Sequence, residues 1–294
     1  MLKNTLLKVC LFISIIFPAI SNANAEQLIS FSAGDIPIII TAPHGGNEAI
    51  PNTPKRTGLD KNGKKKRGFQ PNKDSWTRNI ALTIAEKYQQ HYGVKPYVVV
   101  ANFHRKYLDA NRSTKSAYEH ENAKKQYDAY HGQIKAYINE VNEKFGTGLL
   151  LDVHGQAKSK GSIYRGTRNG TTVENLIKRY GWQAIVGENS LYGGLAEQGY
   201  DLLPKNNEIP NAENKKVERR YVGGNTVKRY GSQHQGGIDA IQMEIGSHMR
   251  FDSIKREKLS ISVAKSLHDF VNHYLCNDIK KTNPKNATFC KSNK

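Results

Sequence analysis

The sequence predicts a single α/β domain built on a mixed, mainly parallel central sheet that is flanked by helices. Short apolar runs of the kind found in buried strands alternate along the chain with segments whose apolar residues recur at helical spacing. This alternation favours parallel strands joined by crossover helices. The sequence shows no internal repeat, and a chain of this length can bury one substantial core.

Five segments are predicted as strands. The first covers residues 38–41 and ends before Pro43, so that His44 lies at the start of a glycine-containing loop. The others are PYVVVANF (96–103), LLLDVHG (149–155), SIYRGT (162–167) and DAIQMEIG (239–246). Three of the five strands therefore lead directly into a histidine.

Helical spacing of apolar residues predicts helices at 76–88, 113–145, 172–181 and 253–275. Asp74 precedes the first of these and is expected at or near a helix N-terminus. The stretch 47–73 is rich in Pro, Gly, Lys and Asn and has no apolar period, which indicates an exposed loop or lid. The polar stretch 204–216 is expected to form a second long loop.

The first 25 residues have the pattern of a secretory signal peptide. Two lysines precede an apolar run at 9–17, and small residues lead to the cleavage pattern Ala23-Asn24-Ala25. The run is shorter than the roughly 20 residues that a membrane span needs, and no later run is that long. We therefore expect a secreted or periplasmic protein without a membrane span, with a main domain at 26–276 and a C-terminal tail at 277–294.

Cleavage after Ala25 would remove Cys10 and leave two cysteines, Cys276 and Cys290, in an oxidising compartment. A disulfide between them that fixes the tail is the expectation, and two free thiols are the alternative.

The chain is strongly basic, with a formal net charge of +18. Loss of Lys3 and Lys8 with the signal peptide would leave about +16. Such a charge suits an anionic substrate, an anionic cell envelope or nucleic acid. Because the lysines are scattered and no binding motif accompanies them, nucleic acid is not expected as a partner.

Histidines at the ends of parallel strands predict a site at one edge of the sheet, where the ligands of open parallel sheets bind. Two histidines such as His44 and His154, together with a carboxylate, form the usual protein ligand set of a catalytic zinc. The candidate carboxylates are Glu48 and Asp74, and the sequence has no H-E-x-x-H motif. Spacing alone leaves a metal site and two unrelated structural histidines as alternatives.

An ordered set of motifs adds to this prediction. They are PHGG (43–46), DSWTRNIA (74–81), HRKYLDANR (104–112), LLLDVHG (149–155), GGNTVKRYG (223–231) and DAIQMEIG (239–246). Together, over roughly residues 36–270, they resemble the N-formylglutamate amidohydrolase family, which shares a fold class with poly-γ-glutamate hydrolases and zinc carboxypeptidases. The resemblance implies a phosphorylase/hydrolase-like, zinc carboxypeptidase-like fold and a catalytic domain at 26–276.

The resemblance also implies that His44 and His154 are ligands of Zn²⁺. It favours Asp74 as the third ligand, because the acidic ligand of the family opens a helix. The stretch between Gly46 and Asp74 is then an insertion, and Glu48 remains the alternative third ligand.

Glu244 matches the general base and acid of this fold class, which acts on a zinc-activated water. The alternative is a surface glutamate on an edge strand. Arg112 resembles the arginine that binds the substrate carboxylate, because a guanidinium pairs with it bidentately. Asn111, Arg105 and Arg229 are further candidates for this pocket.

Two aspartates lie near the predicted ligands. Asp152 is two residues before His154 on the same strand face and is a candidate to orient that histidine. Asp109 is expected to be structural in its turn.

These inferences predict a secreted zinc-dependent amidohydrolase that cuts an amide bond beside a carboxylate. The best-known family members have a D-x-D-W segment, whereas Ser75 precedes Trp76 here. That difference and the export signal favour a small anionic substrate or an acidic peptide or polymer over a formylated metabolite. The alternatives are a non-catalytic envelope module that binds an anionic glycan or peptide, and a basic nucleic-acid binder. The sequence leaves the oligomeric state open.

Overall fold

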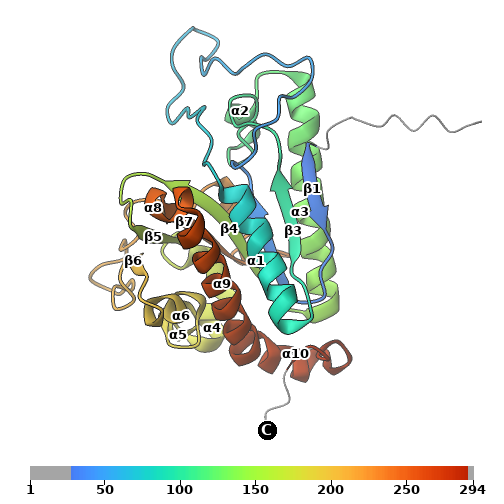
Figure 1. The fold of residues 1–294 in the computed structure, drawn as a ribbon, viewed down its shortest axis with the longest axis vertical. Helices are drawn as coiled ribbons and strands as arrows, with labels where there is room; N and C mark the ends of the chain where they lie inside the picture. Colours follow the sequence, from blue (N-terminus) through green and yellow to red (C-terminus); the bar gives the residue numbers. More distant parts are fainter. Residues whose placement is uncertain (1–27, 291–294) are drawn as a thin grey trace, which may run out of the picture.

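The computed structural model describes residues 28–290, so the predicted signal peptide lies outside the described residues. Within this range the chain forms one seven-stranded sheet in the order β1-β3-β2-β4-β7-β5-β6 (Figure 1). The strands are β1 (Ile29–Ser32), β2 (Ile38–Ala42), β3 (Tyr97–Ala101), β4 (Leu149–Gln156), β5 (Ser162–Gly166), β6 (Asp201–Leu203) and β7 (Asp239–Gly246).

The sheet is mixed and mainly parallel. Strands β3, β2, β4 and β7 run parallel to one another, and β5 is parallel to β6. Strand β1 is antiparallel to β3, and β5 is antiparallel to β7. This arrangement confirms the α/β prediction.

The central strands are apolar because both of their faces are covered. All residues of β2, β3 and β7 are buried. Parallel strands that are buried on both faces have continuous apolar runs in their sequence. Such runs are easy to recognise, so these strands could be predicted from the sequence. Helices α1 (Thr77–Tyr92) and α9 (Ser253–Phe270) pack together on one face, and α3 (Glu121–Phe145) lies on the other (Figure 1).

The remaining helices are shorter. They are α2 (Thr114–Ala117), α4 (Glu174–Tyr180), α5 (Gln183–Val186), α6 (Leu191–Glu197), α7 (Asn225–Tyr230), α8 (Ser247–Phe251) and α10 (Cys276–Thr282). In the described part of the chain, three 3-10 or π segments accompany them, at Thr171–Val173, Val271–Leu275 and Pro284–Asn286.

Two predicted helices differ from the structure. The predicted helix at 113–145 is two helices, because the chain is extended at Tyr118 and again at His120. The imidazole of His120 accepts a hydrogen bond from Asn122 N and so caps α3. Helix α1 begins after Trp76, whose φ of 72° is left-handed, so Asp74 lies two residues before the helix cap. This leaves the Asp74 carboxylate free to point across the end of the sheet.

The predicted disulfide is present between Cys276 and Cys290, 14 residues apart, with a Cα–Cα distance of 5.7 Å. It holds the last described residues against the end of α3, where Phe289 packs edge to face on Phe145. Among residues 28–290, none of the helices combines the length and apolar character that a bilayer crossing requires.

Serine at both Cys276 and Cys290 is expected to lower the free energy of unfolding by about 3 kcal/mol, because the crosslink closes a loop of about 15 residues in the unfolded chain. Urea titration without reductant would measure the loss. The same titration with reductant should destabilise the wild-type protein and leave the double variant unchanged. Equal midpoints for the two proteins under oxidising conditions would contradict the prediction.

Candidate metal centre and active-site cleft

Side chains from four neighbouring parallel strands meet at one edge of the sheet. His44 follows β2, Arg105 follows β3, His154 lies in β4 and Glu244 in β7. Because β3, β2, β4 and β7 are parallel, their carboxyl ends share that edge. The edge forms the floor of a cleft of about 940 Å³ that contains all four side chains.

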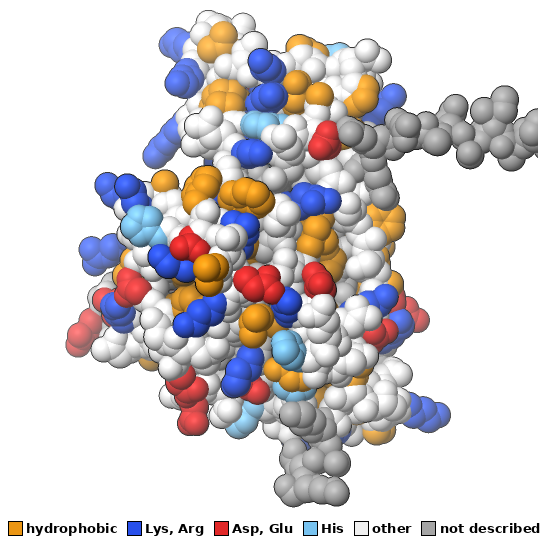
Figure 2. Space-filling view, viewed as in Figure 1, with side chains coloured by type: hydrophobic (Ala, Val, Ile, Leu, Met, Phe, Trp, Pro, Cys, Tyr) orange, Lys and Arg blue, Asp and Glu red, His pale blue; other side chains and the backbone are white. Residues whose placement is uncertain are grey.

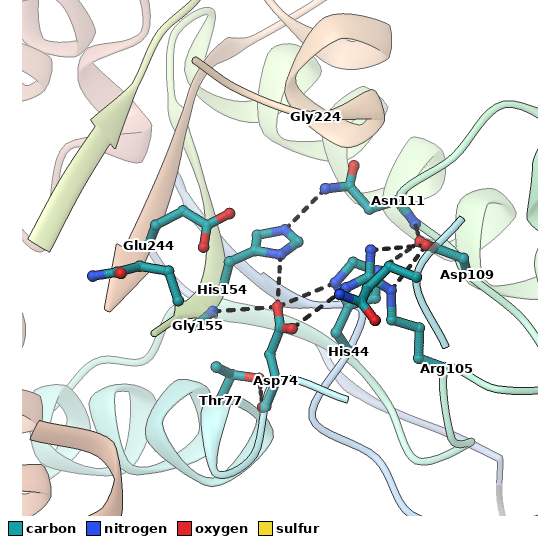
Figure 3. Close-up of polar contacts among 12 residues, drawn as sticks. His44, Asp74, Thr77, Arg105, Asp109, Asn111, His154, Gly155, Gly224 and Glu244 are labelled. Atoms are coloured by element: carbon teal, nitrogen blue, oxygen red, sulfur yellow. Dashed lines mark hydrogen bonds and ion pairs between the residues drawn. The ribbon is translucent and has the colours of Figure 1, made fainter. Parts of the chain in front are cut away.

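Asp74 lies between the two histidines (Figure 3). Its Oδ2 atom is 3.3 Å from His44 Nδ1 and 3.3 Å from His154 Nδ1. The Gly155 amide also donates to this oxygen, at 3.2 Å. Within residues 28–290, these three side chains form the group of His, Cys, Asp or Glu residues with ligand atoms close enough to hold a metal, all within 4.8 Å of one another.

The two nitrogen-to-oxygen spacings fit a tetrahedral ion. Zinc ligands of nitrogen and oxygen lie at about 2.0–2.1 Å, which places neighbouring ligand atoms of a tetrahedron about 3.3–3.4 Å apart. Both nitrogen-to-oxygen separations in the group are 3.3 Å. Two imidazoles and one carboxylate also match the donor set of a zinc site that keeps one position for water.

A buried carboxylate supports each histidine from behind. His44 Nε2 is 2.7 Å from Asp109 Oδ1, and His154 Nε2 is 2.8 Å from Asp152 Oδ2. Each carboxylate can accept an Nε2 proton, which leaves Nδ1 of each ring facing Asp74 as the nitrogen available to a metal ion. Asp152 is held in turn by the Thr41 hydroxyl, which donates to it at 2.6 Å. Such carboxylate–histidine pairs are the usual support of metal-binding imidazoles.

The charged groups of the site shift one another's pKa values. Burial raises the pKa of Asp74, but the adjacent His44 and His154 hold it well below its ordinary value. Burial lowers the pKa of His154, whereas Asp152 raises it, with a net pKa of about 10. In the absence of a cation, the imidazole itself therefore carries positive charge among the carboxylates.

Asp152→Asn is expected to weaken metal binding about 10- to 100-fold, because an amide orients the His154 ring less strongly and makes it a poorer donor. Competition with a chromogenic chelator would measure the affinity. Asp128→Asn, on the exposed face of α3, is the matched control and should bind metal like the wild type. Unchanged affinity in Asp152→Asn would show that this carboxylate does not support the ligand.

Glu244 lies beside the histidine group on the adjacent strand. His154 and Glu244 are direct register partners in β4 and β7. The Glu244 side chain lies on the side of the His154 ring opposite to His44 (Figure 3). It is 93 % buried by accessible surface, and Gln242 Nε2 donates to its Oε1 at 2.9 Å. Burial raises the pKa of Glu244 to about 8, although His154 lowers it. It is therefore a cleft carboxylate and not a surface group of an edge strand.

Arg105 and Asn111 line the cleft but are already engaged by protein groups. Arg105 pairs with Asp109 at 2.8 Å and with Asp74 at 3.4 Å, and it is almost fully buried. Asn111 accepts from Thr226 N at 2.7 Å, and its amide nitrogen contacts Gln242 Oε1 at 3.2 Å. Both side chains therefore hold the walls of the site in place.

Arg112 and Arg229 differ in their positions. Arg112 lines the cleft, and its side chain is 36 % exposed, with bonds to the carbonyls of Asn111 and Gly68. Arg229 is outside the cleft lining, donates to the Tyr127 hydroxyl and lies over the Tyr230 ring. The structure thus places one of these two predicted arginines where a substrate can reach it. For Arg229, the prediction of a pocket position does not fit its place on the exposed side of α7.

Glu48, the alternative third ligand, lies outside the metal group. It lines an adjoining hollow of about 490 Å³ on the other side of the segment that carries Asp74 and Trp76. Its backbone forms an isolated bridge with Phe103. Of the two carboxylates considered as the third ligand, Asp74 is therefore the one that lies with the histidines.

Sequence reasoning missed Arg250, which fixes the approach to the site from α8. Its guanidinium donates to the carbonyls of Ser75, Gln156 and Ile245. It also lies so close to Gly155 that a Cβ there would meet it at 2.5 Å. This arginine ties the segment that bears Asp74 to the strands that bear His154 and Glu244. Its role depends on contacts with Ser75 and Gln156, far from it in sequence, which no local pattern indicates.

Solved structures show where this architecture occurs elsewhere. N-formylglutamate amidohydrolase from Ralstonia eutropha superposes with a TM-score of 0.52 at 13% identity, over 81% of this chain and 95% of that one. A gene product of Agrobacterium tumefaciens gives a TM-score of 0.52 at 11% identity, over 83% and 95% of the two chains. No protein-family model matches the sequence, and no curated protein sequence matches it significantly. The chain shares the fold of N-formylglutamate amidohydrolase, as its ordered motifs predicted.

Proposed function

We propose that this protein is a secreted, zinc-dependent amidohydrolase that cuts an amide bond next to a carboxylate. The observation that carries the proposal is the meeting of a metal-type triad, His44, Asp74 and His154, with the buried Glu244 in one cleft. The shared architecture with an amidohydrolase agrees with this assignment.

Each residue of the site has a distinct role in the proposed amide hydrolysis. A zinc ion held by the triad would supply a water of lowered pKa and would polarise the scissile carbonyl. Glu244 is placed to take a proton from the attacking water and to return it to the leaving nitrogen. Asp109 and Asp152 keep the two imidazoles fixed while this happens.

The charge of the cleft selects for an anion. Six cationic side chains line it, against two carboxylates that the chemistry itself uses, Asp74 and Glu244. The cations are Lys73, Arg105, Arg112, Lys158, Arg220 and Arg250. Of the predicted substrate arginines, Arg112 has both the exposure and the position to pair bidentately with a carboxylate. Suitable substrates are N-acyl amino acids, γ-glutamyl amides and acidic peptides.

The direct test is metal analysis of the purified protein beside hydrolysis of a panel of α- and γ-linked acidic amides, with neutral amides of the same length as controls. The expected result is one zinc per chain and cleavage of acidic amides that stops on chelation and returns with added zinc. A protein that binds no metal, or that binds acidic peptides without cutting any, would overturn the proposal in favour of a non-catalytic binding module.

A further inference from the structure

The stretch that the sequence predicts as an exposed loop or lid contains an ordered hairpin at 55–70, which we call the basic hairpin. Leu59 and Lys65 form an antiparallel bridge across it, and Lys66 N donates to Gly58 O at 2.7 Å. The Asp60 carboxylate accepts from the amides of Asn62 and Lys64, both at 2.9 Å, and closes the turn. The hairpin stands beyond the helical layers at one end of the molecule (Figure 1).

Two clamps fix the base of the basic hairpin to the domain. The buried Arg56 donates to Arg105 O at 2.7 Å and Gln70 O at 3.2 Å, which joins both hairpin strands to the segment after β3. On the other side, Glu119 accepts from Thr57 N at 2.7 Å and from Gly58 N at 3.0 Å. The hairpin is therefore held in one shape before any ligand arrives, which lowers the entropic cost of binding.

The basic hairpin carries a dense positive charge. Residues 55–67 hold seven Lys or Arg side chains and a single acid, Asp60, whose carboxylate is turned onto the backbone of the turn. The exposed cations are Lys55, Lys61, Lys64, Lys65 and Arg67. In Figure 2, Lys and Arg side chains gather at the end of the molecule where Figure 1 draws the hairpin.

The basic hairpin is continuous with the cleft. Its returning strand supplies Gly68, Phe69 and Gln70 to the cleft wall. The Arg112 guanidinium, the candidate carboxylate anchor, donates to Gly68 O at 3.2 Å. Cationic side chains therefore extend from the cleft wall at Arg112 to the tip of the hairpin, and the Glu119 carboxylate at the hairpin base is occupied by Thr57, Gly58 and Lys66.

We propose that the basic hairpin is a docking surface for an acidic polypeptide, one residue of which enters the cleft while neighbouring carboxylates contact the hairpin. The inference rests on the proposed function, because a polymer that reaches the chemistry must contain the scissile amide. Nucleic acid fits less well, since residues 55–67 include no aromatic side chain on which a base can stack. The ring of Phe69, farther along the returning strand of the hairpin, packs against the Arg56 guanidinium.

The test compares two variants that lose the same charge. One carries Gln at the hairpin positions Lys61, Lys64, Lys65 and Arg67. The control carries Gln at four exposed lysines remote from the cleft, Lys258, Lys280, Lys281 and Lys285. Binding of fluorescently labelled poly-L-glutamate is measured by anisotropy in a Glu244→Gln background, so that the polymer is not consumed. The hairpin variant should bind about tenfold or more weakly than the control, and the difference should shrink as salt is raised.

Activity separates this inference from the proposed function. With Glu244 intact, both variants should cut a short acidic amide at the wild-type rate, which also shows that they fold, and the hairpin variant should have a raised KM for poly-L-glutamate alone. Equal binding and equal KM in the two variants would overturn the docking surface and leave the proposed function standing. Tighter, hairpin-dependent binding of a labelled single-stranded oligonucleotide would overturn the choice of an acidic polypeptide. Hairpin-dependent polymer binding by a wild-type protein that cuts no amide would support the docking surface and refute the hydrolase.

Discussion

Glu244→Gln is expected to lower the rate of amide hydrolysis about 10²- to 10⁴-fold while the metal content stays at one ion per chain. The amide keeps the size of the side chain and can still accept the hydrogen bond that Gln242 donates to Glu244. It has no basic oxygen to take a proton from water and no proton of suitable acidity for the leaving nitrogen. The measurements are the hydrolysis rate on an acidic amide and elemental analysis of the same sample.

A matched substitution guards against a general effect of losing one negative charge. Glu143 is an exposed glutamate on α3 that does not line the cleft, and Glu143→Gln should keep both metal and rate. If Glu244→Gln hydrolysed the substrate at a near-normal rate, Glu244 would have no part in proton transfer and the base would have to be sought elsewhere in the cleft.

His154→Ala is expected to remove the metal and with it all measurable hydrolysis. The variant loses one of three ligands, a larger change than the 10- to 100-fold weakening expected when only a supporting carboxylate is altered. It also leaves the fully buried Asp152 without the imidazole that it contacts at 2.8 Å. Elemental analysis after dialysis should find the ion missing.

Two controls separate metal loss from misfolding in this experiment. His234 is an exposed histidine outside the cleft, and His234→Ala should retain the ion. His44→Ala removes the opposite ligand and should lose the ion as His154→Ala does, with circular dichroism recording whether each variant is folded. A folded His154→Ala protein with a full complement of zinc would place the metal outside the triad.

The sequence predicted the central strands well because their burial leaves a direct mark on composition. Strands β2, β4 and β7 are mostly apolar, and several of their few polar residues, such as Asp152, His154 and Glu244, belong to the site. Strand β1 was missed because it is a four-residue edge strand in which Ile29 is buried and Phe31 is 49 % exposed. Its pairing with β3 is a tertiary contact that no local pattern encodes.

The metal triad was predictable for a different reason. His44 and His154 end parallel strands, and parallel strands bring their carboxyl ends together whatever their separation in sequence. The choice of Asp74 over Glu48 came from the motif resemblance, and the structure agrees because the extended segment before α1 turns Asp74 toward both rings.

The supporting residues were harder to predict. Asp109 was expected to be structural in its turn, but its carboxylate is the partner of His44 Nε2. That contact depends on β3 lying next to β2, which the sequence does not state. Arg105 was expected to bind substrate, yet its pairing with Asp109 uses its donors inside the protein. For buried charged residues, the partner and not the residue type decides the role.

The register that pairs His154 with Glu244 has a consequence for how the site opens and closes. Both groups are carried by adjacent interior strands of the sheet, β4 and β7, whose amides are expected to exchange with solvent only when the whole domain unfolds. Asp74 belongs to a segment outside the sheet and can separate from the histidines in a smaller local opening. Hydrogen exchange should therefore show slow, globally protected amides in β4 and β7 and faster exchange at residues 70–76. Added zinc should slow exchange in residues 70–76 alone. Metal binding would then order the segment that carries Asp74, while His154 and Glu244 keep the positions they already have.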